Sequence, residues 1–166
     1  MSSLNFTNIL TQTVDELSES TSYKGLIRQH TDGNPLPSGA MLCEIVELAR
    51  AILFPGYFGN ATLNSRTINY HIGVNVERLM ELLTQQILAG LCSVEENSNQ
   101  AYGEELRLKA ANLSAQFIAQ LPQIRKLLAT DVEAAYNGDP AATSYGEVIS
   151  CYPAIKAISN YRIAHQ

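Results

Sequence analysis

The chain has 166 residues, of which 46% are hydrophobic and 16% are charged, and its formal net charge is −5. No run of lysine or arginine occurs, so the basic stripe that holds a nucleic-acid duplex or an anionic membrane surface is excluded. We therefore expect neither nucleic acid nor a membrane as a partner. Charged residues usually make up about 25% of a free-standing domain. Their low share here favours a surface that is partly covered by other subunits or by another domain.

Residues 1–37 are predicted to form a helical arm followed by a loop. Five apolar residues recur at helical spacing in a first amphipathic helix, namely Phe6, Ile9, Leu10, Val14 and Leu17. A short second helix is expected over residues 23–30, before a loop over residues 31–37 that holds a glycine and two prolines. The N-terminus has no basic region or apolar run of a signal peptide, and no apolar stretch is long enough to span a membrane, so we expect a cytoplasmic protein.

Two helices are predicted in the first half of residues 38–166. Ser38 is a good N-cap for a helix that Phe54-Pro55-Gly56 ends, since proline cannot continue a helix and glycine lets the chain turn. The next helix is expected from about Asn64 to Leu91, with apolar residues in steps of three and four. Its length of roughly 40 Å exceeds what a small domain needs, so it is predicted either to project from the domain or to pack on a partner chain.

Further helices are predicted after a polar linker at residues 95–100. The apolar face of one helix begins near Leu106 and is continued to about Tyr136, and Pro122 either kinks this helix or begins a new one. A turn is expected at residues 137–140, followed by short helices over residues 144–150 and 153–165. No sustained strand pattern occurs. The fold class is therefore predicted to be all-α, with one long central helix, and the domains to be 1–37 and 38–166.

The cysteines and histidines form no motif that indicates catalysis or metal binding. Cys43, Cys92 and Cys151 lie far apart in apolar contexts, which predicts three buried free thiols. His71 lies beside the apolar stripe of its helix, and His165 lies in a last helical turn, where a cation suits the helix dipole. Structural roles are favoured for both, and no metal site is expected.

Asp139 is the carboxylate that the sequence singles out. Pro140 follows it and disfavours helical geometry at Asp139, so its side chain leaves the helix direction. One interpretation is a turn residue that accepts hydrogen bonds from nearby backbone N–H groups. The other is an ionised carboxylate that receives the ammonium group of a ligand through a short, charge-assisted contact.

Residues 124–165 resemble the end of the N-terminal helical domain of bacterial serine O-acetyltransferases. The likeness is carried by Leu127–Ala142, which includes Asp139-Pro140-Ala141, and by the short motifs Glu147-Val148-Ile149, Cys151-Tyr152-Pro153 and Tyr161-Arg162-Ile163-Ala164-His165. The segment 52–58 also resembles one branch of that family. In the family this domain precedes a left-handed parallel β-helix of hexapeptide repeats, and no such repeat occurs in these 166 residues.

The resemblance implies a reaction and one substrate-binding residue. The family transfers an acetyl group from acetyl-CoA to the hydroxyl of L-serine, the first step of cysteine biosynthesis, with a histidine of the β-helix as general base. The aspartate of its Asp-Pro-Ala motif helps to hold serine, and it matches Asp139. The inhibitor cysteine occupies the same site. No catalytic residue is carried over, so we expect these residues alone to be inactive and to bind no cofactor, with acetyl-CoA as co-substrate of the parent enzyme.

The resemblance also implies self-assembly. The family forms a dimer of trimers in which domains of this kind join the trimers, which agrees with the low charge and the long helix. A homo-oligomer is therefore expected. The alternative to an acetyltransferase domain is a stand-alone, non-catalytic helical module for oligomerisation or protein binding. The gene sequence after the codon for Gln166 would distinguish the two hypotheses.

Overall fold

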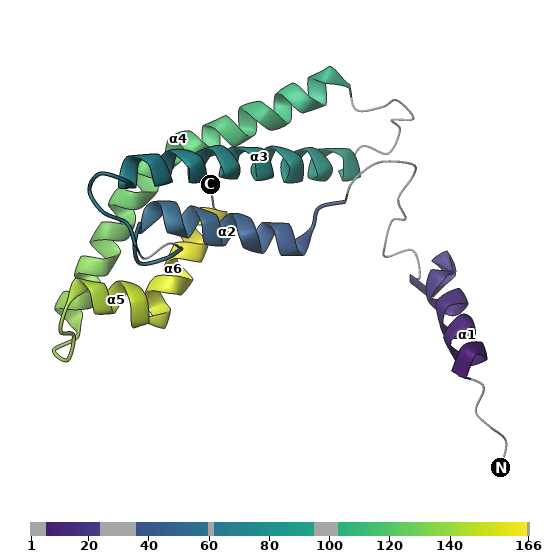
Figure 1. The fold of residues 1–166 in the computed structure, drawn as a ribbon, viewed down its shortest axis with the longest axis horizontal. Coiled ribbons are helices and arrows are strands. Elements are labelled where there is room, and N and C mark those ends of the chain that lie inside the picture. The colour runs from purple at the N-terminus through teal and green to yellow at the C-terminus, as the bar shows by residue number, and fades with distance from the viewer. Residues whose placement is uncertain (1–5, 24–35, 60–61, 95–102, 166) are drawn as a thin grey trace, which may run out of the picture. The chain divides into compact units, whose positions relative to one another are not determined.

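The computed structural model describes residues 6–23, 36–59, 62–94 and 103–165, and the chain divides into the units Met1–Asn34 and Pro35–Gln166. Within these residues the protein is all-α, as predicted, with no strand and one isolated bridge between Pro55 and Phe58 (Figure 1). The helices are α1 (Phe6–Ser18), α2 (Gly39–Leu53), α3 (Ile68–Val94), α4 (Glu104–Gly138), α5 (Tyr145–Cys151) and α6 (Pro153–Ala164), with a 3-10 turn at Ser20–Tyr23. The domain boundary predicted between residues 37 and 38 stays a prediction.

The first unit contains the predicted amphipathic helix. α1 buries none of its residues, and its apolar stripe is exposed, from 46% for Ile9 to 73% for Phe6. The short helix expected over residues 23–30 lies outside the described residues, apart from Tyr23, as do His30 and all of the 31–37 loop except its last two residues.

Helix α2 begins and ends as its sequence indicates. The Ser38 hydroxyl accepts a hydrogen bond from the Met41 N–H, and the Phe54 N–H donates to the Arg50 carbonyl at the other end. Gly56 and Gly59 follow with φ of +87° and +76°, a region that other L-residues rarely adopt. The segment 54–59 is thus a true stop, as predicted.

Helix α3 begins at Ile68, later than the predicted start at Asn64. The Asn64 side-chain oxygen accepts hydrogen bonds from the N–H groups of Arg66 and Thr67, at 2.9 and 3.2 Å. An asparagine that bonds its own neighbouring backbone favours a turn over a helix interior. The helix therefore starts only after this turn.

The predicted long helix is present as α3, with 27 residues, and α4 is a second long helix, with 35 residues. Pro122 lies inside α4 and does not divide it. Leu121 and Ile124, on either side of the proline, are 5% and 1% exposed, so packing holds the helix together where a backbone hydrogen bond is lost. The ribbon of α4 changes direction along its length (Figure 1), and a proline is a usual cause of such a bend.

One hydrophobic core unites the helices of the second unit. α3 lies beside both α2 and α4, and α5 and α6 close the far end of α4 (Figure 1). The largest fully buried apolar side chains of this core are Leu79, Leu82, Ile124, Leu128, Val148 and Ile155. No helix among the described residues is long and apolar enough to cross a membrane.

Two arginines tie α6 to the core. Arg50 of α2 is 1% exposed; its guanidinium binds Glu47 at 2.6 Å, hydrogen-bonds to Asn160 of α6, and lies over the Phe58 ring at 5.3 Å. Arg162 of α6 binds both carboxylate oxygens of Asp131, at 2.6 and 2.8 Å. A bidentate contact of this kind fixes both the distance and the relative orientation of the guanidinium and the carboxylate.

The prediction of three buried cysteines is wrong for two of them. Cys92 is buried, whereas Cys43 and Cys151 are exposed, and all three are free thiols. Cys43 lies on α2 among exposed residues, before the first buried position at Ile45, and Cys151 is the last residue of α5, so neither side chain faces the core. An apolar neighbourhood in sequence does not specify which face of a helix a residue occupies.

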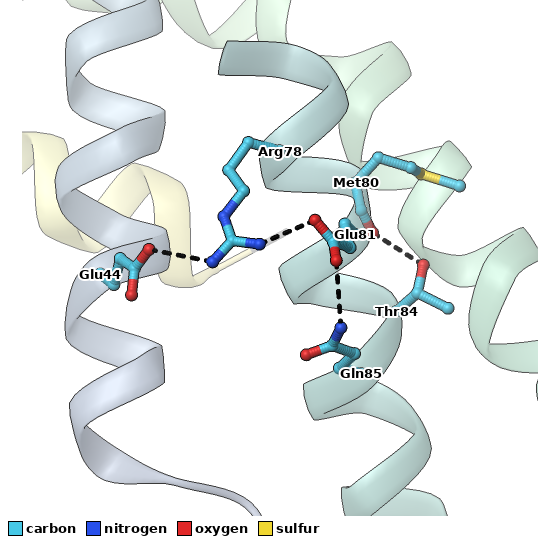
Figure 2. A network of polar contacts seen from close by, with 6 residues as sticks. All are labelled: Glu44, Arg78, Met80, Glu81, Thr84 and Gln85. Atoms are coloured by element: carbon cyan, nitrogen blue, oxygen red, sulfur yellow. Dashed lines mark hydrogen bonds and ion pairs between the residues drawn. The ribbon is translucent and has the colours of Figure 1, made fainter. Parts of the chain in front are cut away.

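We expect Arg50→Ala to lower the free energy of unfolding by about 3 kcal/mol, because it leaves a cavity and an unpaired Asn160 in the core. The matched control is Arg78→Ala. Arg78 is 46% exposed on α3 and binds Glu44 and Glu81 in an open surface network (Figure 2). Its loss should cost at most about 1 kcal/mol. Urea unfolding followed by circular dichroism measures both, and equal effects would contradict the structural role of Arg50.

Candidate functional site: a carboxylate at the end of α4

Asp139 lies directly after the last residue of α4, in the geometry that the sequence predicts. Its φ of −117° and ψ of 105° are extended, as expected before Pro140. The Ala141 N–H donates a hydrogen bond to Asp139 Oδ1 at 2.9 Å. This is the local turn contact of the first interpretation, and it occupies one of the two carboxylate oxygens.

The second oxygen of Asp139 is held by a residue from another segment. The Tyr152 hydroxyl donates to Asp139 Oδ2 at 2.6 Å across α5. Tyr152 is half-buried against the core and lies between α5 and α6. Sequence reasoning missed this partner, because the two residues meet only after α5 has folded back on α4.

Helix α5 is fixed at its start by a network of side-chain caps. The Ser144 hydroxyl accepts from the Glu147 N–H at 3.1 Å, and the Glu147 carboxylate accepts from the Thr143 N–H and hydroxyl at 2.8 and 2.6 Å. A Cβ added at Gly146 would lie 3.4 Å from the Tyr57 ring, so the 54–59 turn packs closely on α5. These contacts set the direction of α5 and hence the place of Tyr152.

The hydrogen bonds at this corner favour one protonation state. The Tyr152 hydroxyl, and then the Ala141 N–H, lower the pKa of Asp139 below its usual value. The same bond to Asp139 raises the pKa of Tyr152 to about 12. The two donors of Thr143 likewise lower the pKa of Glu147, although the nearby charge of Asp139 opposes this. At neutral pH the corner therefore holds two carboxylates and a protonated phenol.

This arrangement is chemically suited to binding a cationic group. An ionised carboxylate has about four acceptor positions, and the described residues use two of those on Asp139. A ligand ammonium can approach the others and gain a charge-assisted hydrogen bond. Within the described ranges, no group of three or more His, Cys, Asp or Glu side chains is arranged to hold a metal ion.

The other predicted residues lie in separate places. His71 is half-buried on α3 with its ring 6.1 Å from that of Tyr70, and His165 is exposed and stacked on Tyr161 at 5.2 Å. Each histidine thus contacts a tyrosine of its own helix region rather than the Asp139 corner. Asp139, by contrast, is hydrogen-bonded to Ala141 and to the side chain of Tyr152 from beyond α5.

The Asp139–Tyr152 bond predicts a stability difference between the wild type and Tyr152→Phe that depends on pH. Asp139 has a lowered pKa, so its contribution is present above its unfolded value of 3.8 and is lost as the pH falls through the folded value. Tyr152 has a raised pKa, so its contribution is present below 10.0 and is lost as the pH rises towards about 12. The difference should be largest between these limits.

Urea unfolding of both proteins across this pH range measures the difference. A gap of constant size from pH 3 to pH 11 would contradict the assignment of the bond to these two groups. The titration is checked independently by absorbance at 295 nm, where Tyr152→Phe should remove one tyrosine whose pKa is raised to about 12.

Comparison with known proteins supplies the family relationship. No family model matches the chain. It is 40% identical over 134 residues to a plasmid-encoded serine acetyltransferase of Synechococcus elongatus. The match covers 80% of this chain and 42% of the relative, so the chain spans less than half the length of that protein, at its N-terminal part. The predicted resemblance is confirmed: the chain is related to the N-terminal part of a serine acetyltransferase.

Proposed function

We propose that the chain is the N-terminal assembly and serine-side domain of a serine O-acetyltransferase. Such an enzyme transfers the acetyl group of acetyl-CoA to the hydroxyl of L-serine, at the start of cysteine biosynthesis. The proposal is supported by the 40% identity to a protein of that name and by the all-helical fold. A cytoplasmic location belongs to the same proposal.

The proposed binding of L-serine is supported by the environment of the Asp139 carboxylate. Its carboxylate is half-buried, accepts one hydrogen bond on each oxygen, and has a lowered pKa. A carboxylate in this state is suited to receive the α-ammonium group of L-serine. Cysteine carries the same α-ammonium group, so it would compete for Asp139 as a feedback inhibitor.

The acetyl-transfer step itself is proposed to need residues outside this stretch. The direct attack of the serine hydroxyl on a thioester requires a general base and a site for acetyl-CoA. In the family that the chain resembles, the general base and the acetyl-CoA site both belong to the β-helix. Residues 1–166 alone are therefore expected to bind serine without releasing CoA from acetyl-CoA.

L-Serine binding to the 166-residue chain, followed by amide chemical shifts, tests the role of Asp139. Asp139→Asn should weaken binding about tenfold or more, since a charge-assisted contact contributes about 1.5–3 kcal/mol. Glu133→Gln, which removes the same charge from an exposed position on the same helix, should leave binding unchanged. N-acetyl-L-serine, which lacks the ammonium group, should not bind, and equal binding of this analogue would contradict the proposal.

Self-association is proposed as the second role of the domain. It is supported by the charged share of 16% and by large apolar side chains that the second unit leaves exposed on three helices, namely Leu42, Tyr70, Val74 and Leu108. An isolated apolar side chain on a surface is ordinary, but several of them in a weakly charged domain favour a covered face.

Sedimentation velocity at tens of micromolar protein should give an oligomer rather than a species of 18.2 kDa. Leu42→Glu combined with Val74→Glu should shift the distribution towards the monomer, because charges resist burial at an interface. Glu44→Gln is a control next to Leu42 on the same exposed part of α2. A wild-type monomer at this concentration would contradict the assembly role.

A further inference from the structure

We infer that Tyr152 is a positioning residue that orients the Asp139 carboxylate for the ammonium group of a ligand while leaving its negative charge in place. The inference rests on the proposed function, since it names the residue that prepares the same site. It assigns a role to a side chain that touches Asp139 rather than the ligand.

Two hydrogen-bond donors from different segments fix the orientation of the Asp139 carboxylate. Ala141, two residues along the chain, holds Oδ1, and Tyr152, from beyond α5, holds Oδ2. A carboxylate with a single partner can rotate about its terminal bond, whereas separate partners on both oxygens fix its plane. The acceptor positions that are left then point in set directions, which is what preorganised binding requires.

Tyr152 is itself held rigidly at the junction of two helices. Its N–H donates to the Val148 carbonyl at 3.3 Å and ends α5, and its carbonyl accepts from the Ile155 N–H at 3.1 Å at the start of α6. Val148 and Ile155 are 0% and 1% exposed. The phenol therefore reaches Asp139 from backbone that is anchored on both sides in the core.

Asp131 also lies near the end of α4, and its contacts differ from those of Asp139. The comparison distinguishes a positioning contact from one that only joins two helices. Asp131 is bound by both arms of the Arg162 guanidinium, at 2.6 and 2.8 Å, which neutralises its charge. Asp139 is bound by a phenol, which donates a hydrogen bond but carries no positive charge. The contact to Asp131 joins α4 to α6, whereas the contact to Asp139 orients a carboxylate that stays available to a cation.

The neighbouring charges agree with this distinction. Glu147 is the other carboxylate whose charge acts on this corner, and its own hydrogen bonds go to Thr143 and not to Asp139 or Tyr152. Cys151, beside Tyr152, contributes a further negative influence if ionised. An arriving ammonium group would thus meet two carboxylates, of which Asp139 has been placed by a neutral donor.

The test is Tyr152→Phe, which removes the hydroxyl and keeps the ring that packs on the core. L-Serine binding to the 166-residue chain should weaken about three- to tenfold, the usual effect of one lost hydrogen bond to a charged group. The pKa of Asp139, measured from its carboxylate ¹³C shift, should rise towards the ordinary value. The control is Tyr145→Phe, at the exposed start of α5, which should change neither quantity.

The outcomes separate the inference from the proposed function. Loss of serine binding in Asp139→Asn together with wild-type binding and an unchanged Asp139 pKa in Tyr152→Phe overturns the positioning role and leaves the proposed function standing. Wild-type serine binding in Asp139→Asn overturns the proposed function, and the positioning role with it. If Tyr152→Phe does not fold, the wild-type ¹³C titration decides: a Tyr152 ring shift that changes as Asp139 titrates supports the inference, and a ring shift that does not change overturns it.

Discussion

The buried stripe of α4 is the constraint on which the second unit depends. α2, α3, α5 and α6 all pack against this one helix, and its inward positions, such as Ile124, Leu128 and Val132, are at most 4% exposed. That shared packing surface keeps the helix continuous past Pro122, where the backbone alone would favour a break. It also fixes the position of the last turns of α4, and so where Asp139 lies relative to the two short helices that follow.

The end of α4 shows how one helix can carry two carboxylates with different uses. Asp131 meets a guanidinium and becomes part of the scaffold, and Asp139 meets a backbone N–H and a phenol and keeps its charge. Arg162 and Tyr152 come from α6 and from the α5–α6 junction, so a single folded-back helical pair supplies both partners. The scaffold and the proposed binding group are therefore built from the same packing.

The relationship to a serine acetyltransferase gives this corner a chemical context. The chain aligns with the N-terminal 42% of that relative, and the corner lies near the C-terminal end of the chain. In the function proposed above, a carboxylate at this position would contact one end of a substrate, and residues of another segment would contact the rest. The assembly proposed for this domain is a separate matter, because the exposed apolar side chains on which that proposal rests lie on α2, α3 and the first turns of α4 rather than at this corner.

Local sequence was sufficient for the helices and for the backbone of Asp139. Periodic apolar residues, the Ser38 cap, the Phe54-Pro55-Gly56 stop and the first-turn Pro153 each act over a few residues, and Pro140 makes Asp139 extended by steric contact alone. Tertiary structure decided the rest: the continuity of α4, the exposure of Cys43 and Cys151, and the bond from Tyr152 to Asp139. These depend on which faces pack together, and that choice is made by the whole core, whose contacts join residues far apart in the chain.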